Sequence, residues 1–172
     1  MPDFAHSFLD RSRRYLTEDY LPRIRICVGR LGDEDLWWRA RDTSNSIGNL
    51  VLHLAGNARQ WIVGGVGGAP DTRRRQSEFD ERGPIPREEL LARLAAAVAD
   101  ADAVLARVTP AGLGERRLIQ GREVTVLDAI YHVVEHFSMH TGQIILLAKM
   151  RAAEEIRFYD VTPDGVAKAN WR

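Results

Sequence analysis

The chain has 172 residues, 45% of them apolar, and its 24 basic and 24 acidic residues balance to a formal net charge of zero. This length suits one domain, residues 1–172, built around a single core. The neutral balance argues against binding to nucleic acid or to a membrane surface. The N-terminus is polar and no apolar run is long enough for a bilayer. We therefore expect a cytoplasmic protein, and Cys27, the single cysteine, should be a buried small side chain.

The first two long segments with the apolar spacing of helices lie in the N-terminal half of the chain. One runs from Phe4 to Gly29 and contains Pro22, which should kink or break it. The other begins near Ser46, a candidate N-cap, and should end within the glycines between residues 64 and 68. Between them, Trp37 and Trp38 are expected to pack over the end of these helices.

Two further helical segments are predicted in the C-terminal half. One runs from Pro86 to about Val108, and the other opens with Thr125 and Asp128, spaced as a capping box, and continues to about Arg151. The fold class predicted is all-α, a four-helix bundle.

The segments that connect or follow the predicted helices also show recognisable sequence patterns. The segment 69–85 is predicted to be a long polar loop, with the run 73–75 of three arginines as a solvated stretch answered by nearby acids. Residues 115–125 are typical of a small β-hairpin that turns at Gln120-Gly121. The last twenty residues are rich in turn formers and should leave Trp171 exposed, unless they pack across the helices or against a partner subunit.

The stretch HVVEHFSMHTGQI carries His132, His136 and His140 at intervals of four residues. On a helix, each such interval rotates the side chain by about 40° and raises it by about 6 Å. Two neighbouring histidines can therefore bind one ion, but the outer two, about 12 Å apart, cannot both reach it. At most one adjacent pair binds a metal, and another element must supply the third ligand.

His53, in the middle of the predicted helix after Ser46, is the candidate for that ligand. Helices that face each other in a bundle often build metal sites in its interior. Three imidazole ligands that leave other coordination positions of the metal open suit zinc, nickel or a similar divalent ion. The alternative is that His53 is a core histidine that only makes hydrogen bonds. His6, near the start of the chain, is expected at the surface.

The stretches NSIGNLVLHLAGNARQWI and HVVEHFSMHTGQI resemble the two signature helices of the DinB-like (YfiT-related) metal-binding bundle superfamily. The resemblance runs from the LWWR segment through the last long helix. It implies that His53, His136 and His140 bind one divalent metal, because Thr141-Gly142-Gln143 follows the pair as in the family pattern. His132 is then left beside the ligands or in the core. Many relatives carry Arg at the position of Thr141, so a role for that Arg does not carry over.

Polar residues near these histidines are candidates for substrate binding. Asn49 and Asn57 lie one turn before and after His53, and Gln143 lies one turn after His140. The alternative for each amide is helix capping or packing. Glu135 should point about 100° away from His136. Gly142 is expected to allow close approach of the two histidine-bearing helices.

Two chemistries follow for such a centre, acting on a small-molecule substrate. A metal with three neutral ligands activates a bound water for hydrolysis, or holds a low-molecular-weight thiol as a thiolate for S-transfer. The resemblance implies both. We expect transfer rather than hydrolysis, because His132 is the single candidate for a general base and no other catalytic residue is identified. The alternative is a non-enzymatic, metal-stabilised binding or stress-response module. The resemblance also implies a homodimer.

Overall fold

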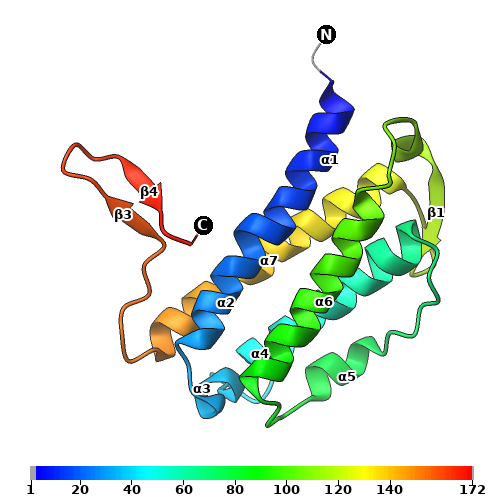
Figure 1. Ribbon diagram of the computed structural model, residues 1–172. Coiled ribbons are helices and arrows are strands. Elements are labelled where there is room, and N and C mark those ends of the chain that lie inside the picture. The colour runs from blue at the N-terminus through cyan, green and yellow to red at the C-terminus, as the bar shows by residue number, and fades with distance from the viewer. Residues whose placement is uncertain (1–2, 172) are drawn as a thin grey trace.

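The computed structural model describes residues 3–171, which are mostly helical with two small antiparallel sheets (Figure 1). The longer helices are α1 (Phe4–Arg14), α2 (Leu21–Gly29), α4 (Ile47–Ala58), α6 (Arg87–Leu105) and α7 (Val126–Arg151). Two π-helical segments, η1 (Tyr15–Tyr20) and η2 (Arg59–Val66), join α1 to α2 and extend α4. The shorter elements are α3 (Asp33–Trp37), α5 (Arg75–Asp80), the 3₁₀-helix η3 (Ala111–Gly114), and the strands β1 (Arg116–Ile119), β2 (Arg122–Thr125), β3 (Tyr159–Val161) and β4 (Ala167–Ala169). Within the described residues, no helix combines the length and the apolar character needed to cross a membrane.

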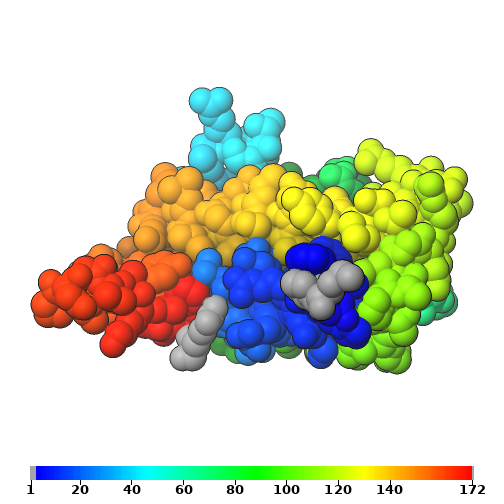
Figure 2. All heavy atoms as spheres, turned by 90° about the horizontal axis from the view of Figure 1, so that it is seen from above, coloured from blue at the N-terminus to red at the C-terminus, as the bar shows by residue number. Residues whose placement is uncertain are grey.

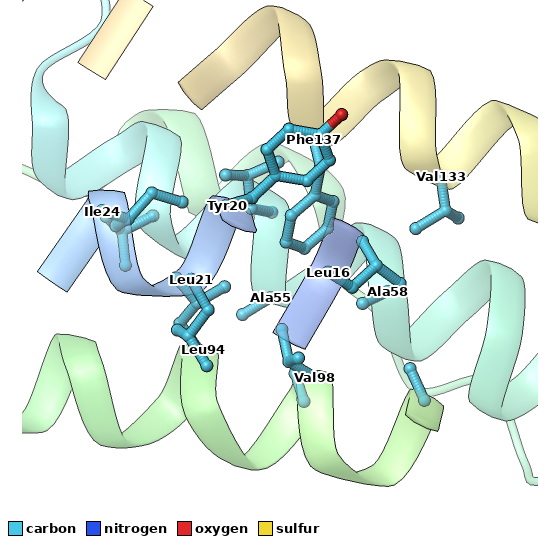
Figure 3. Close-up of a cluster of buried hydrophobic side chains, with 14 of the residues drawn as sticks. Leu16, Tyr20, Leu21, Ile24, Ala55, Ala58, Leu94, Val98, Val133 and Phe137 are labelled. Atoms are coloured by element: carbon cyan, nitrogen blue, oxygen red, sulfur yellow. The ribbon is translucent and has the colours of Figure 1, made fainter. Parts of the chain in front are cut away.

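The long helices enclose one apolar core. α4 packs against α6 and α7, and α2 packs against the same two helices on the other side. Figure 3 shows the side chains that meet between them: Leu16, Tyr20, Leu21 and Ile24 from the first helical run, Ala55 and Ala58 from α4, Leu94 and Val98 from α6, and Val133 and Phe137 from α7. Cys27 is fully buried in the same core, as predicted, and burial raises the pKa of its thiol to about 12.

Of the two outcomes expected of Pro22, a kink or a break, the break does not occur. The chain continues from α1 into α2 along one path (Figure 1). The segment η1, which ends two residues before the proline, is π-helical. In an α-helix the proline ring would meet the carbonyl of residue 18. The wider π turn, in which the N–H of Leu21 bonds to the carbonyl of Leu16, relieves that conflict.

Capping boxes begin the two helices that carry the histidines. Ser46 caps α4 together with Asn49, and Thr125 caps α7 together with Asp128, the latter as predicted. The predicted end of the second helical run is confirmed, because η2 ends at Val66, within the glycines 64–68. The third begins at Arg87, directly after Pro86, and ends at Leu105, three residues before the predicted end. These caps set the start of each helix and therefore the direction in which each histidine points.

The connections confirm one prediction and correct two. β1 and β2 form the predicted hairpin, with Gln120 and Gly121 in left-handed conformations at φ 52° and 73°. The segment 69–85 is not simply a solvated loop, because it contains α5. Trp171 is buried rather than exposed. Arg23 stacks on its ring at 4.0 Å, and the β3–β4 hairpin precedes it.

Candidate metal centre

Three histidines from two helices converge where α4 contacts α7. His53 lies in the middle of α4, and His136 and His140 lie one turn apart on α7. Each offers a ring nitrogen within 4.8 Å of those of the other two. The Nε2 atoms of His53 and His136 are 2.9 Å apart, close to the spacing of two ligands on an ion with bonds of about 2.1 Å. The predicted trio therefore lies together in an arrangement that could hold a metal ion.

Burial keeps two of these imidazoles neutral. For His136, burial and the neighbouring His140 and His53 lower the pKa to about 3. Burial also lowers the pKa of His140. Because a neutral imidazole keeps a lone pair for coordination, both side chains are available as metal ligands at neutral pH.

A carboxylate that the sequence reasoning missed lies against the trio. Glu78, on α5, is buried, and its Oε2 is 2.8 Å from Nδ1 of His53. Phe79 of the same helix packs its ring on the imidazole at 4.7 Å between centroids. Burial would raise the pKa of Glu78, but the bonds from Arg73 and His53 outweigh it and hold the pKa below its ordinary value. Glu78 is therefore an ionised group inside the protein.

Arg73 pairs with this carboxylate, which corrects the prediction of a solvated arginine run. Its Nε donates to Glu78 Oε1 at 2.7 Å, and a terminal nitrogen donates to Oε2 at 2.8 Å. Another terminal nitrogen donates to Gln60 Oε1 at 2.9 Å. The Arg73 side chain is only 5% exposed, whereas Arg74 and Arg75 are exposed as expected. A bidentate pair of this kind buries both charges with their hydrogen bonds satisfied.

Comparison with known families places the chain. A family described as "Protein of unknown function (DUF1572)" matches residues 3–165. The chain belongs to the DUF1572 family. The match includes both histidine-bearing helices and the segment with Arg73 and Glu78. No curated protein matches the sequence.

In this DUF1572 protein, His132 lies beside the trio but outside it. Its ring stacks on His136 at 5.3 Å between centroids and packs at a tilt against Trp61 at 4.1 Å. Its Nε2 is 3.3 Å from the amide nitrogen of Asn57. Burial lowers its pKa. Asn57 Oδ1 and Trp61 Nε1 are buried without a hydrogen-bond partner among the described residues. Asn57 thus contacts His132 rather than His53, and its substrate role stays a prediction.

The other predicted amides have distinct surroundings. Asn49 is fully buried. Its oxygen accepts from Ser46, and its nitrogen donates to the carbonyls of Glu78 and Glu81 at 2.8 and 3.0 Å. These bonds support the capping and packing alternative for this residue. Gln143 Oε1 is 2.7 Å from Nδ1 of His140. When the oxygen of Gln143 accepts a hydrogen bond from the N–H at Nδ1, the other ring nitrogen of His140, Nε2, keeps its lone pair for a metal ion.

Sequence reasoning also predicted the surroundings of two other residues of α7, Glu135 and Gly142. Glu135 is exposed and does not belong to the group of possible metal ligands, as its helical angle predicts. Gly142 is also exposed, and a Cβ built there would meet nothing within 4 Å. The expectation that Gly142 lets the two histidine-bearing helices approach is therefore wrong. A close approach is instead found at Gly56 on α4, where a Cβ would lie 2.0 Å from Glu78 Oε1, so this glycine makes room for α5 rather than for α7.

Proposed function

We propose that this protein is a DinB-like four-helix bundle whose His53, His136 and His140 bind one divalent metal ion, zinc or nickel. The observation that carries the proposal is the convergence of three ring nitrogens within 4.8 Å in a mostly buried position. The lowered pKa values of His136 and His140 support it, because both rings remain neutral. Bonds from His53 to Glu78 and from His140 to Gln143 orient two of the rings.

The proposed activity is thiol-dependent S-transfer on a small-molecule substrate, with metal-dependent hydrolysis as the second candidate. A divalent ion with three neutral ligands lowers the pKa of a bound thiol or water and so supplies a nucleophile at neutral pH. Hydrolysis would profit from a free general base. Glu78 is engaged by Arg73 and His53, and His132 is held between Trp61 and His136. Thiol transfer depends less on a general base than hydrolysis does, and we therefore favour S-transfer.

A non-enzymatic, metal-stabilised module is the alternative. A structural site closes the fourth ligand position with protein, whereas a catalytic site leaves it for substrate or water. Among the described residues, no fourth His, Cys, Asp or Glu side chain joins the trio. This observation supports an open position and therefore favours the enzyme over the module.

Metal analysis tests the ligand set. The wild type, purified without chelators, should hold one ion per chain, and His53→Ala and His140→Ala should lose it. His6→Ala, which removes an exposed histidine outside the trio, is the matched control and should keep it. Full occupancy in both ligand variants would contradict the proposal.

Cobalt substitution tests the chemistry. When the Co(II) protein is titrated with a small thiol, a sulfur-to-cobalt charge-transfer band should grow if the fourth position is open to a thiolate. An unchanged spectrum at millimolar thiol would argue against S-transfer and leave hydrolysis as the candidate. Occupancy by a protein group, seen as insensitivity to both thiol and azide, would favour the non-enzymatic module.

We further propose a homodimer formed through the outer face of α7. This helix runs across the surface in Figure 2, and the exposed residues of one face include Tyr131 (62%), Met139 (48%), Leu146 (61%) and Met150 (63%). Gly142 lies at the centre of that face, where it costs about 1 kcal/mol relative to alanine in a helix. Since no described residue packs on Gly142, a second helix crossing there would give the glycine a function.

The charges on this face suit a second copy of the chain. In an antiparallel pair that crosses at Gly142, residues equally far before and after the glycine face each other. Glu135 precedes it by seven residues and Lys149 follows it by seven, and both are exposed. Opposite charges would therefore meet twice across the two-fold axis.

Light scattering during size-exclusion chromatography tests the dimer. The wild type should elute as a dimer and Leu146→Glu as a monomer. Leu118→Glu, which places the same charge on the exposed β1 strand, should remain dimeric. A monomeric wild type, or a dimeric Leu146→Glu, would contradict the proposed interface.

A further inference from the structure

Three residues on one face of α4 contact, or make room for, the segment that carries Glu78. Asn49, His53 and Gly56 follow one another at helical intervals of four and three residues. Asn49 donates to the backbone carbonyl of Glu78, His53 contacts its carboxylate, and Gly56 leaves the space that this carboxylate fills. Three residues of one helix face thus fix the position of a single side chain.

The hydrogen bonds of the carboxylate define the protonation of His53. Arg73 donates to both oxygens of Glu78, so the carboxylate acts as an acceptor on both sides. We therefore assign the proton of His53 to Nδ1, which donates to Glu78 Oε2. Arg73 also lies 3.2 Å from Nδ1, but both groups are donors, and Arg73 instead donates to both oxygens of Glu78. The proton on Nδ1 leaves Nε2 of His53 with its lone pair directed at His136.

We propose that Glu78, held by Arg73, is the positioning residue of the metal centre: it fixes the tautomer and ring orientation of His53 so that Nε2 faces the ion. This inference rests on the metal centre proposed above and adds to it a residue outside the ligand set. The carboxylate also makes the imidazole a stronger electron donor, and the charge of Arg73 limits that effect. Glu78 does not itself join the ligand group.

A purely structural role for the Arg73–Glu78 pair makes a different prediction. The pair would then only attach the segment 69–85 to α4, and removing the charge of Glu78 would change stability without changing the metal site. Positioning instead predicts that metal affinity, the Co(II) spectrum and the tautomer of His53 change. These measurements therefore separate the two roles.

The first test is Glu78→Gln, which keeps the size of the side chain and removes its charge. Zinc affinity, measured by competition with a chelator, should fall about 10- to 100-fold, and the Co(II) absorption bands should shift. Asp80→Asn is the matched control, since it removes the same charge from an exposed residue of the same helix. It should bind zinc as the wild type does.

The second test displaces the carboxylate without removing any charge. In Gly56→Ala, the new Cβ would lie 2.0 Å from Glu78 Oε1, so the carboxylate must move away from its place beside His53. Zinc affinity should fall while the helix is retained. Gly29→Ala, at an exposed helical glycine with nothing within 4 Å of the new Cβ, should leave affinity unchanged. This variant keeps the inference testable if Glu78→Gln fails to fold.

Each outcome has a defined meaning. Wild-type zinc affinity in both Glu78→Gln and Gly56→Ala would overturn the positioning role. Loss of zinc in Glu78→Gln as complete as in His53→Ala would also overturn it, because Glu78 would then be a ligand. Histidine ¹⁵N NMR of the metal-free protein gives a separate readout: a proton on Nε2 of His53 would overturn the positioning role alone. A wild type that binds no metal would overturn the proposed centre, whatever the tautomer.

Discussion

Two polar clusters lie one helical turn apart between the same pair of helical runs, and they differ in how completely their hydrogen bonds are formed. The trio of His53, His136 and His140 is completed from outside by Glu78 and Gln143. The neighbouring cluster of His132, Asn57 and Trp61 includes two buried polar atoms that have no hydrogen-bond partner within residues 3–171. Histidines at identical spacing on α7 thus have different surroundings, because α5 reaches one cluster and not the other.

The largest predicted difference between the clusters is in metal binding. His136→Ala should reduce metal content from one ion per chain to a small fraction, because it removes a ligand from the trio. His132→Ala should keep the ion and lose the tilted ring contact with Trp61, worth about 0.5–1.5 kcal/mol of unfolding free energy. Elemental analysis and urea unfolding of both variants measure this. Equal metal loss in the two would place the ligand pair one turn earlier on α7.

The two buried asparagines offer the next comparison. Asn49→Ala should cost about 2–4 kcal/mol of unfolding free energy, because it leaves the carbonyls of Glu78 and Glu81 without their donor and removes part of a helix cap. Asn57→Ala should cost about 1 kcal/mol, since it also removes an oxygen that has no partner. Urea unfolding of the metal-free variants tests the order. A larger cost at Asn57 would mean that its hydrogen bonds contribute more than those of Asn49.

The last predicted effect is a pH dependence of the metal-free protein. The pKa of His136 is lowered in the folded state to about 3, from an ordinary value of 6.5, so the unfolded chain binds the proton more readily. Stability should be fully present above pH 6.5 and fall as the pH drops toward 4, by about 1.4 kcal/mol per pH unit at most. Chemical unfolding across this range measures the slope. His136→Gln should flatten it, and an unchanged slope would assign the effect to other groups.

The parts of the molecule that repeat a local pattern were predictable from sequence. The long helices follow from apolar spacing, and the Thr125 cap and the Gln120-Gly121 turn follow from residue types at fixed positions. The grouping of His53 with His136 and His140 needed the helix geometry and the family pattern together. In each case a few neighbouring residues carry the information.

The parts that depend on distant partners were not predictable. Arg73 and Glu78 look like the other charged residues of a polar segment, and α5 is too short to give a clear periodic signal. Their burial results from bonds to α4 that no local pattern records. Trp171 is likewise buried by Arg23, which lies almost the whole chain away. Gly56 could be read from the sequence as a glycine within a helix, but its neighbour Glu78 could not.

The sequence separation of the contacts at His53 has a consequence for how the site forms during synthesis. His53 and Glu78 are 25 residues apart, so both have been synthesised once the chain extends through α5. His53 and His136 are 83 residues apart and meet only after α7 has been made. Because α4 also packs on α6 and α7, the three ligands can come together on the ribosome only after the last long helix has been synthesised.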